Sequence, residues 1–142
     1  MFFNKKKVVK ENNSFLIKIG ALLIHAAKID ENYTSKEEGI ITQTLVELGA
    51  NEEELKSLIN EAKICEENAN QILDFTREIK NLKESNKIKI IKSLWKIIYS
   101  NKDADMYETN LMRRLSGLLY IDNKTMGNIK EQIKKENLKW HI

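Results

Sequence analysis

Hydrophobic residues recur along the chain with the three- and four-residue spacing of amphipathic helices. The first such segment predicts a helix that runs to about Ile29. Its inward positions are Phe15, Ile19, Leu22 and Ala26. No window alternates apolar and polar residues as a half-buried strand does. The pattern therefore predicts an all-α protein.

Six further segments carry the same helical spacing, and polar residues suited to helix starts precede several of them. Ser35 and Glu38 have the spacing of a capping box, in which each side chain accepts a hydrogen bond from the other residue's backbone N–H. Asn51, Asp105 and Asp122 are predicted to cap later helices. The inward positions of these segments are Ile41, Leu45 and Leu48; Leu55, Leu58, Ile59 and Ala62; Ile72, Phe75, Thr76 and Ile79; Ile88, Ile91, Leu94, Trp95 and Ile98; Leu111, Met112, Leu115, Leu118 and Leu119; Met126, Ile129 and Ile133. We expect a compact bundle of about seven helices.

The order of these elements repeats at an offset of 71 residues, with Leu48 falling on Leu119 and Asn51 on Asp122. Each copy reads as an apolar helix, an acidic turn, a capped amphipathic helix and a new cap. Two interpretations stay open: a duplicated helix pair, or coincidence, since any two helical hairpins share some pattern.

The composition fits one globular domain and narrows the fold more than the function. The 142 residues include no proline and five glycines, which favours helices with short connections. We expect residues 1–12 to form a basic N-terminal arm and residues 13–142 the helical domain. A single cysteine, Cys65, excludes an intrachain disulfide and fits a reducing, cytoplasmic location.

Most function classes lack their sequence signatures. No phosphate-binding loop, dinucleotide fingerprint or nucleophile elbow is present, and neither His25 nor His141 has a suitably spaced nucleophile. The basic residues are nearly all lysine, and the net charge is only +3. We therefore expect no enzyme activity and no nucleic-acid partner.

Two polar turns carry the candidate chemistry. Oxygen-bearing side chains occupy alternate positions in each turn, and a glutamate follows. This spacing lets several oxygens converge on a hard cation such as calcium or magnesium. The candidate ligands are Asp30, Asn32 and Glu37 in the first turn, and Asp103, Asp105 and Glu108 in the second. The alternative is that these residues only cap helices and solvate the turns.

The segment from Ala26 to Glu37 and the segment from Leu94 to Glu108 resemble the TerB-like family, which is named for tellurite resistance. The family carries an Ala-Asp-Gly turn followed by a glutamate, twice. Asp30 and Glu37 match the acids of the first copy, and Glu108 matches the glutamate of the second.

The resemblance extends over roughly residues 16–133 but departs from the family pattern at the turns. Glu31 and Lys102 stand where the family has glycine, and Asn101 stands where it has the second aspartate. The resemblance implies an all-helical fold and divalent-cation binding by the acidic turns.

Together these features predict a non-enzymatic stress-response or interaction module with protein partners. Membrane contact is expected only through a partner or through the basic arm, residues 1–12. The alternatives are a structural or protein-interaction domain without metal and, less favoured, a metal-dependent enzyme.

Overall fold

The computed structural model describes the backbone of residues 2–29, 34–100 and 106–140 and the side chains of residues 13–29, 34–100 and 109–136. Within these ranges the chain forms seven α-helices and one short 3-10 helix, with no strand, as predicted. The elements in order are α1 (Phe2–Lys28), α2 (Ser35–Glu47), η1 (Glu52–Glu54), α3 (Leu55–Asn68), α4 (Leu73–Ile79), α5 (Glu84–Tyr99), α6 (Met106–Leu118) and α7 (Asn123–Trp140).

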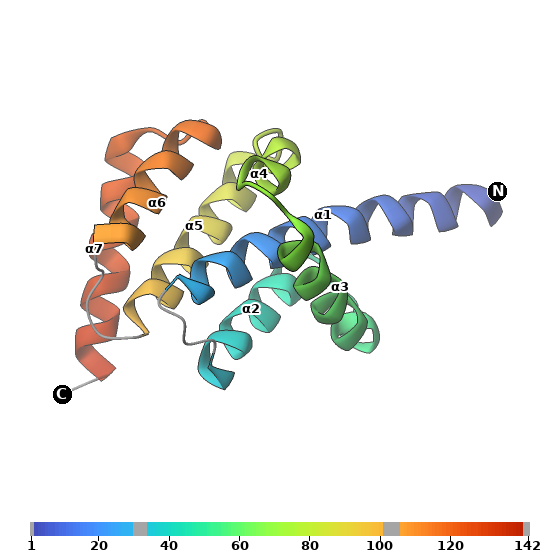
Figure 1. Cartoon of the computed structure of the whole chain (residues 1–142), viewed down its shortest axis with the longest axis horizontal. Helices are drawn as coiled ribbons and strands as arrows, with labels where there is room; N and C mark the ends of the chain where they lie inside the picture. Colours follow the sequence, from blue (N-terminus) through green and yellow to red (C-terminus); the bar gives the residue numbers. More distant parts are fainter. Residues whose placement is uncertain (1, 30–33, 101–105, 141–142) are drawn as a thin grey trace.

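Helix α1 is the central element of the bundle. It packs against α2, α3, α4 and α5, while α7 packs against α5. Its N-terminal turns extend away from the other helices in Figure 1. The helix begins at Phe2, well before the first predicted inward residue, Phe15. The continuous helix thus includes most of the segment set apart as a basic arm, and the division into arm and domain stays a prediction.

Most of the inward positions that the helical spacing predicts lie in the core, although Phe15 is only half-buried and lies outside the core cluster. Leu22, Leu23 and Ile24 have no exposed surface, so this part of α1 is enclosed. Trp95 on α5 is buried, as expected for its place in the apolar pattern. Among the described helices, none is long and apolar enough to cross a bilayer.

Polar groups also join the helices inside the bundle. The hydroxyls of Thr44 on α2 and Ser93 on α5 are both buried and lie 2.6 Å apart. One hydroxyl donates to the other, and the accepting hydroxyl donates to the carbonyl one turn earlier in its own helix, of Ile40 for Thr44 or of Lys89 for Ser93. Neither hydroxyl is therefore left unpaired. This contact ties α2 to α5 across 49 residues of sequence.

One predicted helix start is wrong by a residue. Thr34, not Ser35, is the N-cap of α2, and its partner in the capping box is Glu37 rather than Glu38. Ser35 is the first residue of the helix. The cap predicted at Asn51 is present, although it opens η1, where the Asn51 side chain accepts from the Glu53 N–H at 3.1 Å.

The cap predicted at Asp122 is also present. The Asp122 carboxylate accepts from the Thr125 N–H at 2.6 Å, just before α7. The pKa of the exposed Asp122 carboxyl lies below its ordinary value, mainly because of this hydrogen bond from the Thr125 backbone.

The offset of 71 residues is matched in the helix bounds. Helix α2 spans residues 35–47 and α6 spans residues 106–118, so both ends of α6 lie 71 positions after those of α2. Likewise α1 ends at Lys28 and α5 at Tyr99. The packing of α1 on α3 also has a counterpart in the packing of α5 on α7.

The turns that follow α2 and α6 also share a backbone conformation. Gly49 has φ +106°, and Tyr120, 71 residues later, has φ +57°. The next residue closes the helix end in each copy: the Ala50 N–H donates to the Leu45 carbonyl at 2.8 Å, and the Ile121 N–H donates to the Ser116 carbonyl at 2.9 Å. The pattern is that of a left-handed helix C-terminus.

Candidate functional site

A buried carboxylate lies at the start of α2. Glu37 is the third residue of this helix and has no exposed surface. Its Oε1 accepts hydrogen bonds from the Thr34 backbone N–H at 3.1 Å and from the Thr34 hydroxyl at 2.9 Å. In return, the Thr34 hydroxyl accepts from the Glu37 N–H at 3.3 Å. The capping box therefore fixes this side chain against the helix N-terminus.

The second oxygen of the same carboxylate has no such partner. Among the described residues, no donor lies within hydrogen-bond distance of Glu37 Oε2, although the atom is buried. An unpaired buried oxygen costs about 1–3 kcal/mol, and more when it carries charge. The positive end of the α2 dipole offsets part of that cost. A hard cation would offset more, because carboxylate oxygens are the ligands that calcium and magnesium prefer.

The other predicted ligands of the first turn, Asp30 and Asn32, lie outside the described residues. In the second turn, Asp103 and Asp105 do so too, and Glu108 lies on α6 with a side chain outside the described set. Glu108 is the third residue of α6, as Glu37 is of α2. Across the described positions, no group of three or more His, Cys, Asp or Glu side chains could hold a metal ion.

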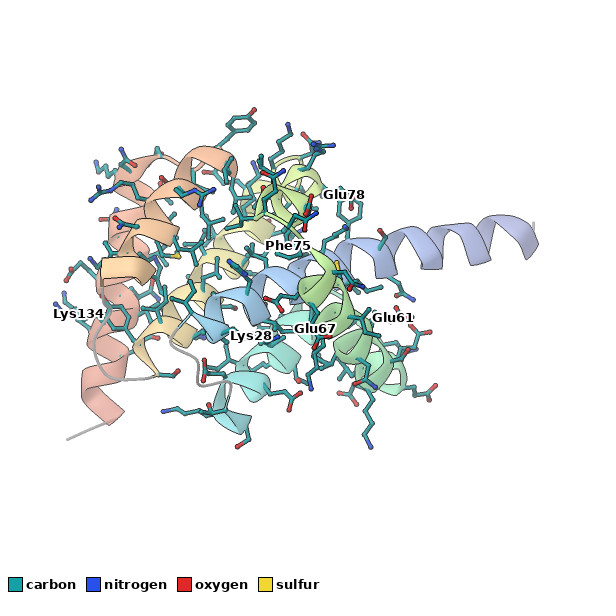
Figure 2. The ribbon with its side chains drawn as sticks, in the orientation of Figure 1. Lys28, Glu61, Glu67, Phe75, Glu78 and Lys134 are labelled. Carbon is teal, nitrogen blue, oxygen red and sulfur yellow. The ribbon has the colours of Figure 1, made fainter. Side chains whose placement is uncertain are left out.

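His25 belongs to a structural cluster between α1, α3 and α4. Its Nδ1 lies 3.4 Å from Glu66 Oε1, and its ring centroid lies 6.1 Å from that of Phe75. Glu66 also pairs with Lys28 at 2.9 Å (Lys28 and Phe75 are labelled in Figure 2). The side chain of His25 is 39% exposed, which fits the partly buried helix residue that its position predicts.

One exposed residue that the helical pattern did not single out is Tyr120, just after α6. Tyr120 is 71% exposed. Its backbone lies in the left-handed region, where non-glycine residues are uncommon. The amines of Lys80 and Lys87 lie 6.0 Å and 5.8 Å from the centre of its ring. The sequence held one signal, since the 71-residue repeat aligns Tyr120 with Gly49.

A family model described as tellurite resistance protein TerB matches residues 16–131. The chain belongs to the TerB family. The matched segment of this TerB domain runs from α1 into α7, so it includes Glu37, Tyr120 and both copies of the repeat. No curated protein and no solved structure gives a significant match to the chain.

Proposed function

We propose that this TerB domain is a non-enzymatic cytoplasmic module of stress response that contacts other proteins and binds a divalent cation at its first acidic turn. The cation would be calcium or magnesium. One observation supports the cation site: Glu37 is fully buried, and its Oε2 has no partner among the described residues.

The argument rests on the charge of this carboxylate. Burying one unpaired carboxylate is costly, and the two Thr34 hydrogen bonds reach only Oε1. Asp30 and Asn32 precede Glu37 by seven and five residues and supply further oxygens in the same turn. A divalent cation held by these groups would neutralise the buried charge and stabilise the folded state by mass action.

A thermal-shift titration with calcium, magnesium or manganese chloride tests the cation site. At a hundredfold excess over the dissociation constant, binding adds about 2.7 kcal/mol. This raises the melting temperature by several degrees for a domain of this size. The double variant Asp30→Asn with Glu37→Gln should lose the shift. Its glutamine side chain keeps an oxygen that can accept from Thr34.

Glu38→Gln is the matched control, because it removes a charge one residue away. Glu38 pairs with Lys63 at 3.0 Å on the outside of the helix, so the control should keep the cation response. If no cation moves the wild-type transition, or if the double variant responds as the wild type does, the cation site is wrong.

The alternative is a structural or protein-interaction domain without metal, in which Glu37 serves only the capping box. The reciprocal hydrogen bonds with Thr34 support this alternative. A metal-dependent enzyme is the less favoured proposal. The one described histidine, His25, is held by Glu66 and Phe75 in the structural cluster between α1, α3 and α4.

A further inference from the structure

Charge is divided unevenly along the chain. Residues 31–78 carry 12 acidic and 4 basic side chains, a net charge of −8. Residues 79–142 carry 14 basic and 7 acidic side chains, a net charge of +7. The first stretch contains α2, η1, α3 and α4, and the second contains α5, α6 and α7. Figure 1 places α3 and α7 at opposite ends of the bundle, while α4 of the first stretch packs against α6 of the second.

A cavity of about 220 Å³ lies between α4 and the end of α6. Leu73 and Leu118 give it apolar walls, while Arg77, Lys80 and Tyr120 supply two cations and an aromatic ring. Leu73 is 39% exposed, and it and Tyr120 are two of the four large exposed hydrophobic residues in the described part of the chain. We call this feature the Tyr120 cavity.

The cations at the Tyr120 cavity form no close ion pair with the described carboxylates. Neither Arg77, Lys80 nor Lys87 forms a salt bridge with any of them. Lys87 is only 8% exposed, and its amine lies beside the Tyr120 ring. Two ammonium groups close to one ring repel each other, so an anionic group placed between them would be attracted.

The backbone of Tyr120 adds a second argument. A tyrosine at positive φ costs about 1–2 kcal/mol that glycine, found in the first copy at Gly49, would not. Backbone strain of this kind lowers the stability of the fold, and it is found most often at functional positions. Tyrosine and arginine are also enriched where a few residues dominate binding energy.

We propose that the Tyr120 cavity docks an acidic peptide segment of a partner protein. One apolar side chain of the segment enters between Leu73 and Leu118, and flanking carboxylates pair with Arg77, Lys80 and Lys87. The cavity is smaller than the roughly 300–1,000 Å³ of small-molecule sites, so it suits a single side chain. Its apolar walls favour a peptide over a nucleic-acid strand, and the cations beside the Tyr120 ring favour an acidic one.

This proposal rests on the protein-contact role proposed above and is independent of the cation site. The test is a selection of random dodecapeptides on phage against the full chain, in buffer with EDTA. We expect enriched sequences with an aromatic or aliphatic residue flanked by Asp or Glu. Fluorescence polarisation with a labelled copy of the leading peptide then gives its affinity.

Three variants assign the binding to the Tyr120 cavity. Tyr120→Gly removes the ring but suits the positive φ, so its circular dichroism melt should be no lower than that of the wild type. This variant and Lys80→Glu should each weaken the peptide by about tenfold or more. Lys56→Glu makes the same charge change on α3 and should leave the affinity within about twofold.

Each remaining outcome overturns the proposal. Selected peptides without acidic enrichment exclude the proposed partner chemistry. Acidic peptides that bind Tyr120→Gly as well as they bind the wild type place the contact on another surface, and the interaction role then survives without this cavity. Failure to select any peptide overturns the cavity proposal and leaves the protein-contact role to surfaces that do not bind short peptides. An oligo(dT) strand that binds at Tyr120 more tightly than the peptides identifies a nucleic-acid site instead.

Discussion

The contact between α1 and α3 depends on a glycine. A Cβ atom added at Gly20 would lie 3.0 Å from the Cβ of Ala62, closer than the roughly 3.5–4.0 Å of a favourable carbon contact. Gly20 is buried in the interior of α1, where alanine would otherwise be the better helix former. We therefore expect Gly20→Ala to destabilise the domain in spite of its gain in helix propensity.

The two opposing effects can be estimated. The propensity gain is about 1 kcal/mol, and forcing a methyl group into a packed interface costs roughly 1–3 kcal/mol. The free energy of unfolding should thus fall by up to about 2 kcal/mol for Gly20→Ala. Ala62→Gly loses about 1 kcal/mol of propensity and nearly as much from the buried methyl group. Exchanging both residues moves one methyl across the interface, so the double variant should lie within about 0.5 kcal/mol of the wild type.

Urea denaturation of the four proteins, followed by far-ultraviolet circular dichroism, measures this cycle. The coupling between the two positions should be at least about 2 kcal/mol. Gly39→Ala on α2 is the matched control, since no atom lies within 4 Å of its added Cβ, and it should stabilise the domain by about 0.5–1 kcal/mol. If Gly20→Ala stabilises as Gly39→Ala does and the double variant is additive, the close approach of α1 and α3 is refuted.

Three further predictions follow from the helix starts and from the chain's first residues. Thr34→Ala should lower the free energy of unfolding by about 1 kcal/mol because it removes the cap of α2, whereas Ser35→Ala should change it by less than about 0.5 kcal/mol in chemical denaturation. The lowered pKa of Asp122 means that its ionised carboxylate stabilises the fold at neutral pH. This contribution should be lost as the pH falls below the ordinary pKa of 3.8 and then through the lowered pKa. Asp122→Asn should remove that part of the pH dependence of the melting temperature. Deleting residues 1–10 should leave the melting temperature within a few degrees, because the buried positions of α1 begin at Leu16 among its described side chains.

Each of these expectations has a contrary result. A larger loss in the free energy of unfolding for Ser35→Ala than for Thr34→Ala would show that Ser35, not Thr34, is the N-cap of α2. Identical acid-side melting profiles for the wild type and Asp122→Asn would remove the stabilising role of this carboxylate. Collapse of the shortened chain would show that residues 1–10 contribute to the core.

The helices and the core were largely predictable because both follow from the spacing of apolar residues. Trp95 continues the apolar face of its helix, and it is buried. The cap at Asp122 was also predictable, since a short side-chain oxygen just before an amphipathic segment has few other local partners. These features depend on residues that are near neighbours in the sequence, so they can be predicted from a single sequence.

The start of α2 could not be decided locally. Thr34 and Ser35 are both good caps, and each has a glutamate three residues later. Burial separates them: Glu37 points into the protein, while Glu38 pairs with Lys63 on α3. The choice is made by the packing of α2 in the bundle, which periodicity does not reveal.

Tyr120 was missed for a related reason. Tyrosine rarely adopts positive φ, so its side-chain type gave no sign of a left-handed turn. Only the comparison of the two copies does so, because the equivalent residue is Gly49. The metal ligands of the two turns stay predictions, with Glu37 as the one ligand whose side chain the structure describes.

The repeated helix order also bears on how quickly the chain can fold. Packing of α1 on α3 joins residues 41 positions apart, such as His25 and Glu66, whereas packing of α1 on α5 joins the two copies. Closing a chain segment twice as long costs only about 0.6 kcal/mol more entropy, so docking the copies is a modest extra step. Helical bundles, in which many contacts lie within single helices, fold in microseconds to milliseconds. We expect this domain to fold in that range, with α1 and α5 meeting after each copy has begun to form.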